Sequence, residues 1–315
     1  MAIVFPGSLS RAEIASGLLI RSVKINGAYL LCNDININQT QEIDTLSDLV
    51  QGGPGQAVSN IGAKKFTGSL SFPLRVMGDG SVELAARNLI NHVQNPINPL
   101  RIDSNHILSY LGITAENHPT DDNSLLSLDS LAIKSLSING SVDSEIKVSV
   151  DFEGMIDLRT SSDTVTTNND KLGRALTWGD CNIFRSESSM RSVSNFELSL
   201  TNEIETPVFL MPYMGASTGR TDQIGLIGIK SIKWTGNVEE VIRRGADYYS
   251  HIHGGWIVND NLTIEIAGLR AIFKVPLFNV AEIPLSANFI VRKTSWTGLM
   301  KPNLPMTSNQ LISFT

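Results

Sequence analysis

Cysteine, long apolar runs and a leader sequence are all scarce or missing in this 315-residue chain. The two cysteines, Cys32 and Cys181, lie far apart, so they form no disulfide framework and we expect two buried free thiols. No apolar stretch approaches the ~20 residues that span a bilayer. The first residues lack the basic leader and apolar core of a signal peptide. We therefore expect a soluble protein, made in the cytoplasm, with no membrane partner.

The chain also lacks a basic run and any patch in which basic and aromatic residues alternate. Its formal net charge is −6, whereas a protein that binds nucleic acid by neutralising phosphates usually carries a positive surface. This composition argues against specific binding of DNA or RNA.

Motifs for catalysis and for cofactor binding are missing as well. The stretch Gly52–Gly55 has no Lys-Ser/Thr to complete a phosphate loop, and Gly78–Ser81 lacks the glycine spacing of a dinucleotide fingerprint. His251 and His253 would share a face of a strand, but no acid or cysteine lies nearby at ligand spacing. We expect a surface or interface pair there, no catalytic residue, no metal and no cofactor. The chain does not read as an enzyme.

What the sequence does contain is an internal repeat. Ile35–Thr45 resembles Phe196–Thr206 in an Ile/Leu-x-x-x-x-Glu-Ile-acid-Thr pattern. Ile61–Leu70 resembles Ile229–Val238, and each of these carries an aromatic residue followed by Thr-Gly. The order is the same in both copies and the period is about half the chain. Such self-similarity predicts a duplicated domain.

The length of the chain agrees with two domains of roughly 150 residues each. A polar stretch rich in Ser, Thr, Asn and Asp separates the copies and reads as a linker. We expect a first domain with an N-terminal arm and long loops over residues 1–160, a linker over 161–175, and a second domain with a C-terminal tail over 176–315.

Strict alternation of apolar and polar residues predicts that these domains are built from strands. It runs from Phe66 to Val76 and, most cleanly, from Glu145 to Phe152, which we pair with Ile133–Ile138 in a hairpin turned at Asn139-Gly140. Gly68 and Gly236 fall within such strands, which we read as plain two-sided strands, with a bulge or a close backbone approach at the glycines as the alternative.

Helical patterns are few. Ser81–Asn95 has an apolar stripe and Pro96 after it, Tyr248–His253 is a weaker candidate, and Ala12–Ile20 could form a short helix in the leading arm. The predicted fold class is mainly β (β-rich α+β), with two tandem β-sandwich or barrel domains that each carry one short helix.

In this order of elements the chain resembles the tail tube proteins of tailed bacteriophages, a family related to the inner tubes of contractile injection systems. The resemblance lies in Phe66–Leu70, in Trp234–Val238 and in the hairpin from Ile133 to Phe152. It covers most of the chain, from about Val23 to Leu158 and from Leu176 to Trp296. The family has a shared topology and patterning rather than an invariant motif.

The resemblance implies a structural virion protein in the phage tail, made in the host cytoplasm. In that family six tube domains close a ring, and rings stack into a tube that conducts DNA during ejection. A doubled chain would need three copies, which gives a homotrimeric, pseudo-hexameric ring. The implied partners are other copies of the chain, a tape measure protein in the lumen, a sheath, a baseplate hub and a tail terminator, while DNA passes without specific binding.

Two sets of residues follow as candidate sites. A lumen that passes DNA should be polar without being basic, and the polar faces of the terminal strands supply the proposed lining: Glu145, Lys147, Ser149, Asp151, Glu153, Glu282, Ser286, Asn288 and Arg292. The glycine-rich loop between Asp44 and Asn60 is long enough to reach a neighbouring ring. Its proposed stacking residues are Gln51, Gly52, Gly53, Pro54, Gly55 and Gln56.

Two other functions stay open at this point. A baseplate hub or tube-end adaptor ring would share the fold and differ in copy number per particle. A carbohydrate-binding β protein is the alternative from a different class, because tryptophans can stack on sugars. The chain has four of them, Trp178, Trp234, Trp256 and Trp296.

Overall fold

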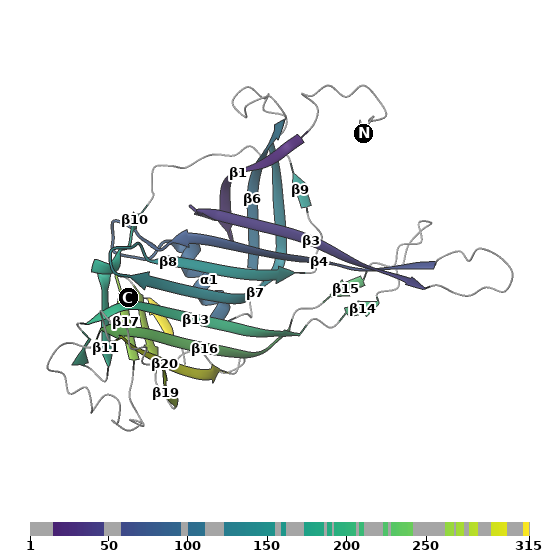
Figure 1. The fold of residues 1–315 in the computed structure, drawn as a ribbon. Helices are drawn as coiled ribbons and strands as arrows, with labels where there is room; N and C mark the ends of the chain where they lie inside the picture. Colours follow the sequence, from purple (N-terminus) through teal and green to yellow (C-terminus); the bar gives the residue numbers. More distant parts are fainter. Residues whose placement is uncertain are drawn as a thin grey trace, which may run out of the picture.

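The chain folds mostly into antiparallel strands, as the alternation predicts, with one α-helix in the part of the chain that the structure describes (Figure 1). The computed structural model describes residues 15–46, 58–95, 100–110, 123–154, 159–161, 173–185, 188–190, 192–205, 208–210, 223–225, 228–241, 262–267, 269–273, 277–282, 291–300 and 311–314. The proposed stacking residues 51–56, the pair His251 and His253, and the weaker helix predicted at Tyr248–His253 lie outside these ranges.

The centre of the molecule is a continuous run of eight antiparallel strands in the order β3-β4-β8-β7-β13-β16-β20-β19. The first four come from the first half of the chain and the last four from the second half. Their bounds are β3 Asp34–Leu46, β4 Val58–Pro73, β8 Lys147–Gly154, β7 Asn123–Ser141, β13 Val193–Glu205, β16 Gly228–Val241, β20 Val291–Met300 and β19 Leu277–Glu282. The two halves therefore share one sheet, joined where β7 pairs with β13.

Strand β7 is long enough to take part in two layers. Its second part lies in the central run, and its first part pairs with β6 and β9. Strand β6 pairs with β1, which turns back into β2. The bounds here are β1 Ala15–Ile25, β2 Ala28–Leu30, β6 Leu100–Tyr110 and β9 Arg159–Ser161.

The second half also forms a smaller sheet of its own, in the order β12-β11-β17-β18-β21. Its strands are β11 Cys181–Arg185, β12 Ser188–Ser189, β17 Leu262–Ile266, β18 Leu269–Phe273 and β21 Ile312–Phe314. Two short ladders complete the described fold: β5 Arg75–Val76 with β10 Arg174–Ala175, and β14 Val208–Leu210 with β15 Gln223–Gly225.

The repeated sequences occupy matching positions in the central sheet. Ile37 of β3 lies opposite Gly68 of β4, and the aligned residue Leu198 of β13 lies opposite Gly236 of β16. Both ladders then shift register at the same place, between Gln41 and Ile43 in β3 and between Glu203 and Ile204 in β13. A register shift is thus present in both pairs, but it lies several residues away from the glycines, where the ladders are regular.

A reciprocal aromatic–glycine pairing follows in each half. Phe66 lies opposite Gly154 and Gly68 opposite Phe152 where β4 pairs with β8. Where β16 pairs with β20, Trp234 lies opposite Gly298 and Gly236 opposite Trp296, which is the same arrangement. Gly68 is therefore more than a residue of a plain strand: a Cβ there would lie 2.4 Å from the Phe152 ring and 2.5 Å from the Asn36 carbonyl oxygen, which is the close approach named as the alternative.

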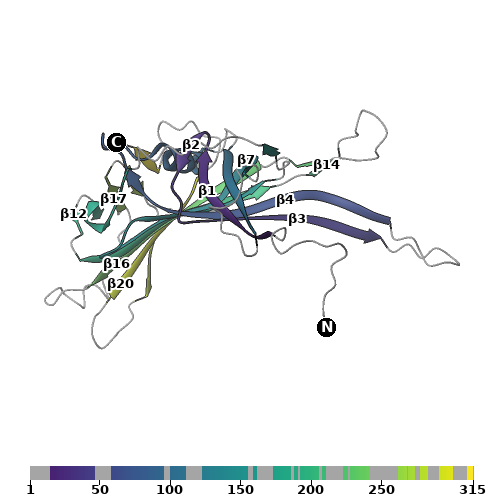
Figure 2. The same cartoon turned by 90° about the horizontal axis from the view of Figure 1, so that it is seen from above.

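The hydrophobic core lies on one side of the central sheet. Helix α1 (Leu84–Gln94) confirms the predicted helix, and it buries Ala85, Ala86, Leu89, Ile90 and Val93 against the sheet. Ile146, Val148 and Val150 point to the same side and are at most 1% exposed. In Figure 2 the helix and the smaller sheets lie on one side of the long strands, and the other side of those strands carries no second layer of described elements.

Two local predictions are wrong. The segment predicted as a short helix over Ala12–Ile20 is strand from Ala15 onward, because Leu18, Leu19 and Ile20 pair with β6. Asn139-Gly140 does not form the hairpin turn. It continues β7, where Gly140 gives room to the ring of Phe196 on β13, and the chain turns later, over Val142–Ser144.

In the second half, the strand that pairs with β16 as β8 pairs with β4 is β20. In addition, no helix of the described residues is long and apolar enough to cross a membrane.

We predict that Gly68→Ala destabilises the fold by about 1–3 kcal/mol, because the added methyl group meets a ring and a backbone carbonyl that cannot both move away. Chemical denaturation measures the change. Gly78→Ala is the matched control, since a Cβ at Gly78 meets nothing within 4 Å. Equal stabilities of the two variants would contradict the close approach.

Candidate assembly surfaces

The side of the central sheet opposite the core is a broad polar face. In β8 the side chains of Lys147, Ser149 and Asp151 are exposed, while the intervening residues are buried. Glu145 is exposed too, but it precedes β8 and forms an isolated bridge with Thr177. Glu153 departs from the prediction, since only 7% of it is exposed.

The remaining proposed lining residues belong to the second half. Glu282 is the last residue of β19 and Arg292 lies in β20 opposite Glu240. The side chains of both residues lie outside the described part of the structure. Ser286 and Asn288 lie outside the described residues.

A row of hydroxyl side chains crosses the middle of this face. Six consecutive strands place a serine or threonine at paired positions, so that each hydroxyl residue lies opposite the next one. The row consists of Ser71, Ser149, Ser137, Ser199, Thr235 and Thr297. No sequence window reveals it, because it depends on the register of strands from both halves.

Charged side chains on the face occur beside polar or oppositely charged neighbours. Asn237 donates to Glu197 at 3.2 Å, and Lys230 lies 3.4 Å from Glu203 and 3.8 Å from Glu205. Lys230, Glu203 and Glu205 are each more than half exposed, so these ion pairs contribute little to stability. The described part of the face thus carries no concentration of positive charge.

The central run ends in two strand edges. Among the described residues β3 pairs only with β4, and β19 pairs only with β20. The core-side residues of β3 are also incompletely covered: Ile35 and Ile37 are half-buried, whereas Phe196 and Leu198, the aligned residues of β13, are 1% and 0% exposed. An edge with unpaired backbone groups and partly exposed apolar residues is a template for pairing with another strand.

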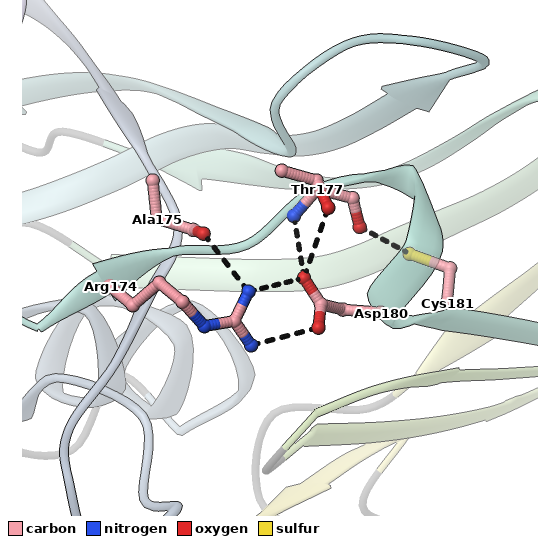
Figure 3. A network of polar contacts seen from close by, with 5 residues as sticks. All are labelled: Arg174, Ala175, Thr177, Asp180 and Cys181. Carbon is pink, nitrogen blue, oxygen red and sulfur yellow. Dashed lines mark hydrogen bonds and ion pairs between the residues drawn. The ribbon is translucent and has the colours of Figure 1, made fainter.

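A polar clasp holds the turn at the start of the second half (Figure 3). Arg174 donates to both carboxylate oxygens of Asp180 at 2.8 Å, and the Thr177 amide donates to the same carboxylate at 2.9 Å. Next to it, Leu176 is fully buried and its amide donates to the carbonyl of Leu74 in the first half. The Leu176–Leu74 hydrogen bond and the β5–β10 ladder attach the start of the second half to the first, and the clasp holds the turn beside them.

These contacts determine the pKa values in the clasp. The hydrogen bonds from Arg174 hold the pKa of the Asp180 carboxyl well below its usual range, and the hydrogen bond with Asp180 raises the pKa of Arg174. Burial, with the Asp180 charge beside it, raises the pKa of the Cys181 thiol to about 12. Burial also raises the pKa of Cys32. Both thiols are therefore protonated at neutral pH and poor nucleophiles, in line with the free cysteines expected from the sequence.

The tryptophans do not form a sugar-binding platform in the described part of the chain. Trp234 is 5% exposed and Trp296 is fully buried, so neither ring offers a free face. Trp178 is half-buried and stacks on Phe196, with 6.0 Å between the ring centroids. Trp256 lies outside the described residues.

Within the described residues no group of three His, Cys, Asp or Glu side chains could hold a metal ion. His92, on α1, is 6% exposed and part of the core. No protein-family model matches the chain, and comparison with curated proteins gives no match either. The functional argument therefore depends on the geometry of the polar face, of the two edges and of the seam between the halves.

We predict that the clasp makes stability depend on pH. Because the pKa of Asp180 is lowered on folding, its contribution is complete above the unfolded carboxyl pKa of about 3.9 and is lost as the pH falls through the lower folded value. Asp180→Asn should therefore be less stable than the wild type at pH 7, and the difference should narrow below about pH 4.

Urea denaturation of both proteins between pH 2 and pH 7 measures this difference. Glu205→Gln is the control, since Glu205 is exposed and makes only a long surface ion pair. A constant gap between the wild type and Asp180→Asn over that range would contradict the assignment.

Proposed function

We propose that this chain is a tail tube subunit of a tailed bacteriophage, a structural virion protein of which three copies close a ring. Rings stack into a tube whose lumen conducts DNA during ejection. The observation that carries the proposal is that the two edges of the central sheet can pair with each other. The edge strands β19 and β3 are the counterparts of β7 and β13, which already pair at the centre of the sheet.

A duplicated domain is the first step of the proposal. The supporting evidence is that strand order, partners and register recur. β3 and β4 correspond to β13 and β16, and β8 corresponds to β20 through the aromatic–glycine pairs. The counterpart of β7 is divided between two strands, β18 and β19. The first part of β7 pairs with β6, and β18 pairs with β17 in the same way. The second part of β7 pairs with β8, and β19 pairs with β20 in the same way.

The free edges follow from this correspondence. The seam inside the chain pairs β7 with β13. The counterpart of β7 is β19, the counterpart of β13 is β3, and both of these have an open edge in the described structure. β19 of one copy can therefore pair with β3 of the next as β7 pairs with β13. Ser135 lies opposite Thr201 at the internal seam, so Asn279 should lie opposite Thr40 between copies.

The register of the sheet is compatible with closure. Paired positions lead from Asp34 in β3 through Ser71, Ser149 and Ser137 to Ser199 in β13, which is the counterpart of Asn38. Following the paired positions across four strands therefore leads from position 34 to the equivalent of position 38. The register thus shifts by four residues for every four strands. With a rise of ~3.3 Å per residue and ~4.8 Å between strands, a barrel of that shear has strands tilted by about 35°, within the usual range.

A ring of three chains contains six of these four-stranded units. At ~4.8 Å between strands and that tilt, the resulting barrel of about 24 strands is roughly 45 Å across its backbone. Helix α1 and the smaller sheets form a second layer on the core side of the sheet. The outside of a ring has a larger circumference than its inside, so this second layer fits on the outside. The polar face consequently becomes the lumen.

The chemistry of that face suits a conduit. DNA binds tightly to surfaces that neutralise many phosphates, whereas this face offers a hydroxyl row and a few lysines with acids around them. The tape measure protein would occupy the same lumen before ejection, and hub and terminator would close the ends. The β3–β4 hairpin projects far beyond the body in Figures 1 and 2 and is the element proposed to contact the next ring.

A cysteine pair across the proposed seam tests ring closure. Thr40→Cys combined with Asn279→Cys, in a background with Cys32→Ser and Cys181→Ser, should form disulfides between chains on oxidation. Because the ring closes, the ladder of species on a denaturing gel should stop at three chains.

Asn36→Cys combined with Asn279→Cys is the matched control, since position 36 is four residues out of register and on the same face of β3. Monomers from both pairs would contradict the edge pairing. Equal yields from both pairs would contradict the register.

A lysine in the hydroxyl row tests the conduit. Ser137→Lys should make rings retain a short linear DNA duplex in a gel-shift assay at about 0.15 M salt, with retention falling steeply as salt rises. Wild-type rings should retain none. Leu84→Lys, at an exposed position of α1 on the opposite layer, should behave as the wild type. Binding by both lysine variants alike would place the lumen elsewhere.

A further inference from the structure

The seam between β7 and β13 is bridged a second time, by helix α1 on the core side of the sheet. The helix belongs to the first half, yet it contacts β13 of the second half as well as β7. Its last turn lies close enough to the second half for direct hydrogen bonds. The two halves are therefore connected at two levels, in the sheet and in the layer above it.

Asn202 makes the first of these connections. It lies on β13, is 3% exposed, and donates from its amide nitrogen to the carbonyl of Ile133 on β7 at 2.7 Å. The same nitrogen lies 3.5 Å from the carbonyl of Val93, in the last turn of α1, where helix carbonyls lack partners within the helix. One buried side chain thus joins β13, β7 and α1.

Gln94 makes the second connection, to the C-terminal strand. Its amide nitrogen donates to the carbonyl of Ile312 at 3.1 Å, and its carbonyl oxygen accepts from the Ile312 amide at 2.8 Å. Gln94 is 2% exposed. About two turns earlier on the helix, the guanidinium of Arg87 lies 5.0 Å from the ring centre of Phe314. Strand β21 is thereby fixed to the helix of the other half.

The position of these contacts gives them a mechanical effect. Hydrogen bonds within a sheet leave the angle between neighbouring strands soft, and observed values range from about −10° to −35°. A second layer packs about 10 Å above the sheet. Contacts at that distance must stretch or break when the angle between the strands changes, so they resist the change more than contacts within the sheet do. A ring of six halves needs each half to turn by about 60° relative to the last.

We propose that the seam clamp, formed by Asn202, Gln94 with Ile312, and Arg87 with Phe314, sets the angle between the halves and so fixes the number of chains in the ring. This inference rests on the proposed function, since it concerns the ring that function requires. The clamp holds the internal seam at the angle that every seam of a uniform ring must have. Without it the subunit still folds and still exposes both edges, but closes at variable copy number or stays open.

The experiment compares the full-length wild type with Asn202→Ala and Gln94→Leu, each alone. Native mass spectrometry gives the number of chains per particle, and negative-stain images give the ring diameter. The wild type should form rings of three chains. Each variant should show a several-fold larger share of other copy numbers and open arcs.

Ile264→Val is the matched control, because Ile264 is fully buried in the smaller sheet of the second half and belongs to no part of the clamp. It should lower thermal stability while keeping three-chain rings. If a buried variant fails to fold by circular dichroism, Arg87→Ala decides, since it removes the contact with Phe314 from a half-buried position.

The outcomes separate the two claims. Uniform three-chain rings from the folded clamp variants overturn the clamp and leave the proposed function standing. A wild type that forms no ring at all overturns the proposed function, and the clamp with it. Mixed copy numbers from Ile264→Val as well would show that any loss of stability has this effect, which also overturns the clamp.

Discussion

The main-chain pairing of β7 with β13 is the constraint on which the rest of the structure depends. It turns two four-stranded units into one sheet and buries Phe196, Leu198 and Leu200 beneath the seam. Backbone hydrogen bonds carry no sequence preference of their own, so what one pair of strands does inside the chain, an equivalent pair can do between chains. The proposed ring uses this one geometry at every seam.

The reciprocal aromatic–glycine pairs explain why the repeat survives as a readable string. In each of these pairs of strands, an aromatic residue on the first strand lies opposite a glycine on the second. Two residues away, a glycine on the first strand lies opposite an aromatic residue on the second. Phe66 with Gly154 and Trp234 with Gly298 therefore constrain four positions at once. A larger residue at Gly68 or Gly298 would meet the buried ring of Phe152 or Trp234, whereas at Gly154 it would meet the side chain of Leu131.

Much of the fold could be predicted from the sequence, because alternation and helical periodicity are local signals. Strand β8 and helix α1 follow from them. The errors arose where local and tertiary signals compete. Leu18, Leu19 and Ile20 suit a helix end but pair with β6, and Asn139-Gly140 suits a turn but lies in β7 because Gly140 makes room for Phe196.

The candidate surfaces divide in the same way. The polar face of β8 was visible as every second residue, except that Glu153 is buried. The hydroxyl row and the buried contacts of Asn202 and Gln94 were not visible, since each joins residues from both halves through the register of β7 and β13. A single sequence holds no signal for such contacts beyond the presence of an amide residue in an apolar stretch.

The most direct test of the central claim is the structure of the assembled protein by electron cryomicroscopy. The account predicts a closed barrel in which the backbone of β19 continues into β3 of the next chain, with the hydroxyl row facing the channel. A monomer at micromolar concentration, or an assembly in which these two edges remain unpaired, would contradict it.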